Sequence, residues 1–146
     1  MIAAIASDSS EQRSAEPEML AALALQLGSP LAPKTLKTEE GGQVQVAGFS
    51  DEPLVLCETY AHHGSLKAGQ KHKIAADALK LVFVEKLLSR PALKIILLAD
   101  EEAASYLRGR SWLAAALKAM GVEVRVVGIR AELAEAIRAA QARQYR

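Results

Sequence analysis

Glu58 has the clearest potential for chemistry in this sequence, because it closes an otherwise apolar stretch, residues 54–57. A carboxylate buried among such side chains is costly unless a cation, a metal ion or hydrogen-bond donors compensate its charge. Hard cations such as Mg²⁺ prefer carboxylate oxygens as ligands. Glu58 is therefore a candidate metal ligand or general base. The alternative is an acid at a strand end that reaches solvent or a lysine.

A second candidate group follows in the segment GQKHKIAADALK, residues 69–80. Its polar residues recur at three- and four-residue intervals, which places them on one helix face: Gln70, Lys73, Asp77 and Lys80. A lysine beside a carboxylate–metal site polarises a phosphate or a water molecule. Lys73, assisted by Gln70, is thus a candidate catalytic residue. The alternative is a solvated face with ordinary ion pairs.

The histidines and the single cysteine carry weaker signals. His62 and His63 are adjacent and His72 follows nine residues on. Adjacent side chains of an extended chain point apart, which argues against a shared zinc ion. Cys57 faces away from Glu58 in a strand, and we expect it to be a small core residue.

The segment RGRSW, residues 108–112, is the last candidate. Arg108 and Arg110 are able to hold phosphate through bidentate contacts. The alternative is a junction between two helices at Gly109. We expect Trp112, the one tryptophan, to pack into the core.

The remaining patterns predict the elements that must position these residues. We expect a loose lead-in over residues 1–13, a helix over 14–27, and a loop with a short strand near 35–38. A hairpin of strands 43–49 and 54–60 follows, then a helix over 70–88 and a buried strand over 93–99. The rest predicts a helical stretch over 101–120 broken at Gly109, a strand over 122–129 and a closing helix over 131–143. Helical crossovers between strands favour a mixed sheet flanked by helices, in the α/β class.

The hairpin register follows from the turn at residues 50–53. With Phe49 opposite Leu54, Ala47 lies opposite Leu56 and Gln45 lies opposite Glu58. These side chains would share one face of the sheet.

Length and composition restrict the class of protein. The 146 residues suit one domain, with 51% hydrophobic, 24% charged and 4% aromatic residues. Apolar runs are too short to span a bilayer and the start lacks a basic signal-peptide region, so we expect a cytoplasmic protein without membrane contact. The sequence contains no phosphate loop, GxGxxG or GxSxG motif. Residues 1–60 carry three basic and nine acidic side chains, and residues 61–146 carry fifteen and eight. A positive half of this kind suits a polyanionic partner, and charges that face each other across the fold are the alternative.

The stretch VQVAGFSDEPLVLCETYAHHGSLKAGQKHKIAADALKL, residues 44–81, resembles the core of the PD-(D/E)xK, restriction-endonuclease-like phosphodiesterases. The family core is a helix, a three-stranded meander, a helix and a fourth strand. The resemblance covers residues 14–99 and implies that residues 100–146 are an appended helix–strand–helix.

The resemblance assigns Glu58 to the metal-binding acid of the (D/E)xK element. Tyr60 stands where the family has its lysine. That lysine can migrate to the following helix, so Lys73, Lys71 or Lys67 is the implied replacement.

The family's upstream aspartate should lie near Ala47, which cannot bind a metal. Asp51 is the substitute that a bent hairpin would bring back to Glu58, and Glu18 or the pair Glu39 and Glu40 are further sources of an oxygen. One carboxylate holds Mg²⁺ weakly. The resemblance thus implies either a poor nuclease or an inactive relative.

The resulting hypothesis is a metal-dependent nuclease or a nuclease-like nucleic-acid-binding protein, with weakly bound Mg²⁺ and with DNA preferred over RNA. Glu58 and Asp51 would hold the metal ion. Residues expected to contact the nucleic acid are Lys67, Lys71, Lys80, Arg108 and Arg110.

Two other hypotheses remain open at this stage. A non-catalytic interaction module of the same fold, as a homodimer or a subunit of a larger assembly, would use the alanine-rich helices at 14–27 and 131–143. A small-molecule-binding α/β domain would use Asp100 at the end of the strand LKIILLAD.

Overall fold

The computed structural model describes residues 10–128 together with residues 139 and 142. The chain begins with helix α1 (Ser10–Leu27), followed by strands β1 (Ala32–Lys37), β2 (Gln43–Ser50) and β3 (Val55–Tyr60). Helix α2 (Ala68–Leu88) leads to β4 (Leu93–Leu98). Two short helices, α3 (Glu101–Leu107) and α4 (Trp112–Ala119), then lead to β5 (Val122–Val126).

The five strands form one mixed sheet in which the spatial order equals the chain order, β1-β2-β3-β4-β5. Strands β1 to β3 form an antiparallel meander. Strands β4 and β5 each run parallel to the preceding strand, because helices return the chain between them. The predicted α/β class with a mixed sheet flanked by helices is confirmed.

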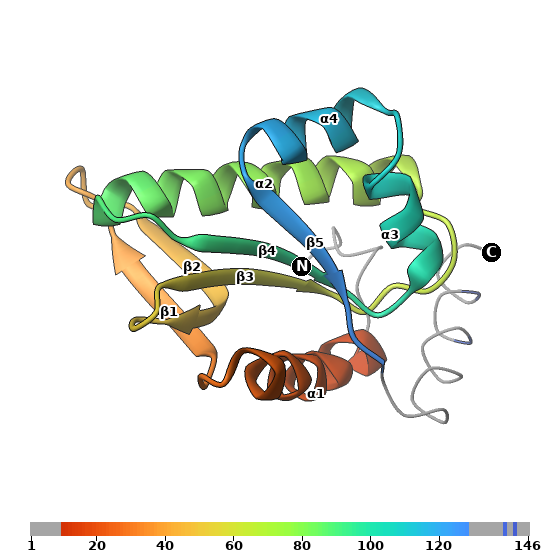
Figure 1. Ribbon diagram of the computed structural model, residues 1–146, viewed down its shortest axis with the longest axis horizontal. Coiled ribbons are helices and arrows are strands. Elements are labelled where there is room, and N and C mark those ends of the chain that lie inside the picture. Colours follow the sequence, from red (N-terminus) through yellow and green to blue (C-terminus); the bar gives the residue numbers. More distant parts are fainter. Residues whose placement is uncertain (1–9, 129–138, 140–141, 143–146) are drawn as a thin grey trace.

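Helices cover both faces of the sheet (Figure 1). Helix α1 packs on one face, where Ile95 and Leu97 of β4 meet its apolar side. Helices α2, α3 and α4 pack on the other face, where Ile96 and Leu98 point. The continuous apolar run of β4 therefore divides by alternation between two cores, as expected for a central strand.

Several element boundaries differ from the prediction. Helix α1 begins at Ser10, so residues 10–13 are helical and do not belong to a loose lead-in. The break near Gly109 is confirmed, because α3 ends at Leu107 and α4 begins at Trp112. The predicted helix at 131–143 lies outside the described residues, 139 and 142 excepted. None of the helices in the described part of the chain is long and apolar enough to cross a membrane.

The hairpin register predicted from the sequence is wrong by two residues. Phe49 pairs with Leu56 and Ser50 pairs with Val55, because the four-residue turn spans residues 51–54 and not residues 50–53. A register shift of two residues leaves every side chain on the same face of the sheet. A shift of one residue would move all of them to the opposite face. The correct register brings Ala47 level with Glu58.

Candidate functional site

The sheet splits between β2 and β3, next to Glu58. Ala32 pairs with Phe49 and Lys34 pairs with Val46, so Pro33 alone lies opposite two residues of β2. A proline has no N–H for the ladder and is found at edges and bulges. Pairing of β2 with β3 ends at Gly48 and Cys57. Beyond this point β2 follows β1, while β3 follows β4.

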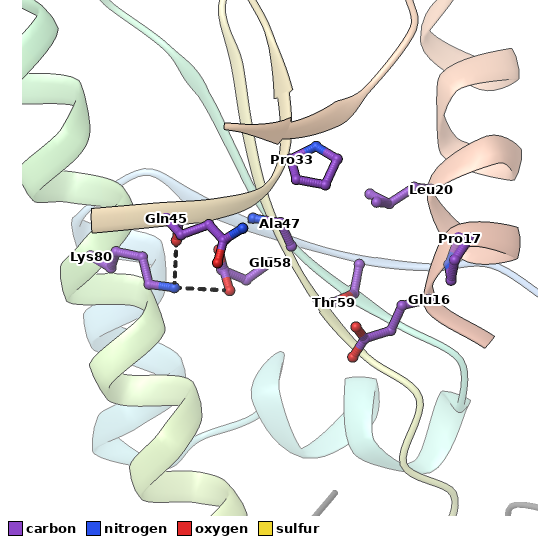
Figure 2. Close-up of a pocket in the computed structure, with 9 residues that line it drawn as sticks. All are labelled: Glu16, Pro17, Leu20, Pro33, Gln45, Ala47, Glu58, Thr59 and Lys80. Carbon is purple, nitrogen blue, oxygen red and sulfur yellow. Dashed lines mark hydrogen bonds and ion pairs between the residues drawn. The ribbon is translucent and has the colours of Figure 1, made fainter. Parts of the chain in front are cut away.

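A cavity of about 530 Å³ lies at this split. Figure 2 shows α1 on one side of the opening and the contact between Lys80 and Glu58 on the other. The lining residues come from α1, β1, the two separated strands β2 and β3, and α2: Glu16, Pro17, Leu20, Pro33, Gln45, Ala47, Glu58, Thr59 and Lys80. The cavity thus lies where β2 and β3 separate, beside the bulge opposite Pro33.

Glu58 is buried at 7% exposure and points into the split. Its Oε2 accepts a hydrogen bond of 3.0 Å from the backbone N–H of Ala47, so the carboxylate replaces a strand carbonyl as the partner of that N–H. Its Oε1 lies 3.1 Å from Nζ of Lys80. Burial raises the pKa of Glu58, and the contacts with Ala47 and Lys80 oppose this rise.

Lys80, not Lys73, is the lysine in contact with Glu58. Its Nζ also donates to the carbonyl oxygen of Gln45 at 2.9 Å and lies 3.7 Å from Oδ1 of Asp77. Figure 2 shows the contacts of Lys80 with Glu58 and with Gln45. The ammonium is therefore bound by three oxygens from three elements, β2, β3 and α2.

Asp77 is a second buried carboxylate of the site, at 7% exposure. Its Oδ2 accepts a hydrogen bond of 2.5 Å from the hydroxyl of Tyr60 and lies 3.3 Å from Nζ of Lys73. Burial and the negative charge of Asp77 raise the pKa of Tyr60, which keeps its hydroxyl protonated as a donor. The predicted helix face thus delivers Lys73, Asp77 and Lys80 to one cluster, which we call the Glu58–Lys80 cluster.

Gln70, predicted to assist catalysis, caps the helix. Its Oε1 accepts a hydrogen bond of 2.6 Å from the backbone N–H of Lys67, the N-cap residue of α2, and the residue is 1% exposed. Lys71 lies over the ring of Tyr106, with its Nζ 4.3 Å from the centroid. These residues belong to the first turn of α2, away from the cavity lining.

Asp51, predicted as a metal ligand, is not brought together with Glu58. It lies in the hairpin turn, 72% exposed in its side chain, and binds Arg90 at 2.8 Å. Four residues separate it from Ala47 along the strand, roughly 13 Å. The hairpin does not bend back over this distance.

Glu16 is the acid on α1 that reaches the cavity, and sequence reasoning missed it in favour of Glu18. The signal was available in the helical period. Glu16 precedes Leu20 and Leu23, both on the buried side of α1, by four and seven residues, which places it at the border of that side.

The RGRSW segment lies at the junction of α3 and α4, beside β5. Arg108 donates to the carbonyl oxygen of Val124 at 2.6 Å, and Arg110 is exposed. The expectation that Trp112 packs in the core is wrong, because the residue is 76% exposed. Helix α4 buries Leu113, Ala114 and Leu117 instead.

The histidines form no recognised metal site. Nε2 of His62 lies 3.1 Å from the carbonyl oxygen of Ser65, and Nδ1 of His63 lies 3.9 Å from Asp100. Within the described residues, no group of three or more histidine, cysteine, aspartate or glutamate side chains is arranged to hold a metal ion.

Comparisons with known proteins leave the family open. No protein-family model, no curated protein and no solved structure gives a significant match to this chain.

Proposed function

We propose that this chain is a nuclease-like nucleic-acid-binding protein, and that the cavity between β2 and β3 receives a phosphodiester of the backbone. The observation that carries the proposal is a pair of anchored ammonium groups: Lys80 lines the cavity, and Lys73 is linked to Lys80 through their shared partner Asp77. Lys73 is held by Asp77 and Lys80 by Glu58, while their side chains remain 50% and 26% exposed. Lysines held in place lose less conformational entropy when a phosphate binds.

Burial of charge supports a functional origin for the cluster. Two carboxylates and a tyrosine hydroxyl are buried around these lysines, and such an arrangement is seldom more stable than apolar packing of similar volume. Buried ionic groups at a cavity are more typical of functional sites than of parts of a protein that serve only its stability.

The topology is compatible with the resemblance to the PD-(D/E)xK phosphodiesterases. A helix, an antiparallel meander, a crossover helix and a parallel fourth strand follow in that order. Topology alone does not assign function, so the anchored lysines remain the main argument. The resemblance favours DNA as the nucleic acid.

We further propose that the site is catalytically degenerate and that binding needs no divalent cation. Metal-assisted hydrolysis needs a cation to activate water and to neutralise charge. The resemblance expects an acid near Ala47, where this chain has a methyl group, and Lys73 and Lys80 balance the charges of Asp77 and Glu58. The cluster therefore has little net attraction for a divalent cation.

Fluorescence anisotropy with labelled DNA and RNA, in EDTA and in Mg²⁺, tests the proposal. We expect binding in EDTA. Lys73→Ala should weaken it several-fold and reduce the slope of log K against log salt by about one. The matched control is Lys118→Ala, an exposed lysine of α4, which should leave binding unchanged.

Two results would contradict the proposal. The binding function fails if none of the nucleic acids binds at low salt, or if Lys118→Ala weakens binding as much as Lys73→Ala. The degenerate site is wrong if plasmid DNA is cleaved with Mg²⁺ or Mn²⁺ and Glu58→Ala abolishes the cleavage.

A further inference from the structure

The ammonium of Lys80 has the surroundings of a bound cation. Its three oxygen neighbours are Oε1 of Glu58 at 3.1 Å, the carbonyl oxygen of Gln45 at 2.9 Å and Oδ1 of Asp77 at 3.7 Å. An ammonium has three N–H donors and no acceptor. Two carboxylates and one carbonyl are also ligands that a hard divalent cation takes.

The oxygens around Lys80 are held by other contacts. The second oxygen of Glu58 is bound by the N–H of Ala47, and the second oxygen of Asp77 is bound by the hydroxyl of Tyr60. Outer contacts of this kind orient the ligands of metal sites. The two inward oxygens should therefore keep their positions when the ammonium is removed.

We propose that the ε-ammonium of Lys80 fills a latent divalent-cation site formed by Glu58, Asp77 and the carbonyl oxygen of Gln45. In the wild-type protein the ammonium of Lys80 occupies this position, and its positive charge repels a metal ion. Without Lys80, two buried carboxylates lose their shared counter-ion, and a cation that binds both relieves their repulsion. The inference goes beyond nucleic-acid binding, because it concerns the cluster in the free protein.

Titration of the free protein with Mn²⁺ tests the inference, by calorimetry and by the electron paramagnetic resonance signal of unbound Mn²⁺. We expect Lys80→Ala to bind Mn²⁺ at least about tenfold more tightly than the wild type. Mn²⁺ should also raise the melting temperature of this variant and leave that of the wild type unchanged.

Two matched variants isolate the role of Lys80. Lys73→Ala removes a lysine of the same helix that contacts the other oxygen of Asp77, so the site stays filled and Mn²⁺ binding should equal that of the wild type. In the double variant Lys80→Ala with Glu58→Gln, one carboxylate ligand is lost and the gain in Mn²⁺ affinity should disappear.

The inference is overturned if wild-type protein binds Mn²⁺ as tightly as Lys80→Ala, or if a folded Lys80→Ala variant does not gain affinity. If Lys80→Ala is unfolded without metal, refolding by Mn²⁺ supports the inference and failure to refold contradicts it. No nucleic acid is present in these measurements, so their outcome is independent of the proposed function.

Discussion

At the scale of single residues, the site depends on which lysine of α2 lies level with Glu58. The sequence identifies Glu58 through its apolar neighbours, and the helical period identifies the face that carries Lys73 and Lys80. These two lysines are seven residues apart, roughly 10 Å along the helix. The choice between them depends on how far the loop over residues 61–67 carries the chain before α2 returns, and no local pattern encodes that distance.

His62 is a single residue that should make the stability of the protein depend on pH. Burial lowers its pKa below the ordinary value of 6.5. Below pH 6.5 the unfolded chain therefore binds a proton more readily than the folded chain, so stability is fully present above this pH and falls as the pH drops.

We expect His62→Gln to flatten this acid loss of stability between about pH 6.5 and pH 5. Urea unfolding across that range measures the free energy of unfolding. His72→Gln, which replaces an exposed histidine of α2, is the control and should follow the wild-type curve. Equal slopes for His62→Gln and wild type would show that His62 is not the group responsible.

At the scale of elements, the start of α2 is fixed by Gln70. Its amide oxygen binds the N–H of Lys67, one of the donors that a helix start leaves without an intrahelical partner. We expect Gln70→Ala to lower the free energy of unfolding by about 1–2 kcal/mol while nucleic-acid affinity stays within twofold of wild type, about 0.4 kcal/mol.

Gln70→Glu serves as the matched variant, because a carboxylate accepts the same hydrogen bond and suits a helix N-terminus. Thermal and urea unfolding of both variants measure stability, and anisotropy measures affinity. A Gln70→Ala variant with wild-type stability and lost affinity would restore Gln70 to the binding site.

The bulge in β2 is a feature of an element that the sequence pattern could not predict. Val44 and Val46 follow the two-residue period of a strand, and Phe49 follows Val46 after three residues. This break is the local trace of the bulge opposite Pro33. The sequence alone could not assign it, because its partner residue Pro33 lies on a different strand and the register between the two strands is set by tertiary pairing. The same pairing decides that Ala47 lies beside Glu58.

At the scale of the whole molecule, the hydrophobic pattern of the sequence was sufficient to predict a sheet covered by helices on both faces. The apolar run over residues 93–99 predicts a strand buried on both faces, and the side chains of β4 do divide between two cores. The charge asymmetry between the two halves of the sequence is partly resolved by pairs that join them. Glu58 binds Lys80, and Asp51 binds Arg90. Neither pair follows from a local pattern, because each joins residues more than twenty positions apart.

Trp112 has a further consequence for how this protein is observed. It is the only tryptophan and is 76% exposed at the start of α4. We expect its fluorescence maximum and its quenching by iodide to change little on unfolding in urea, while circular dichroism reports the full transition. A large blue shift in the folded protein would contradict this exposure. Tryptophan emission here is thus a poor reporter of folding, but it is a natural optical label for any molecule that settles on α4.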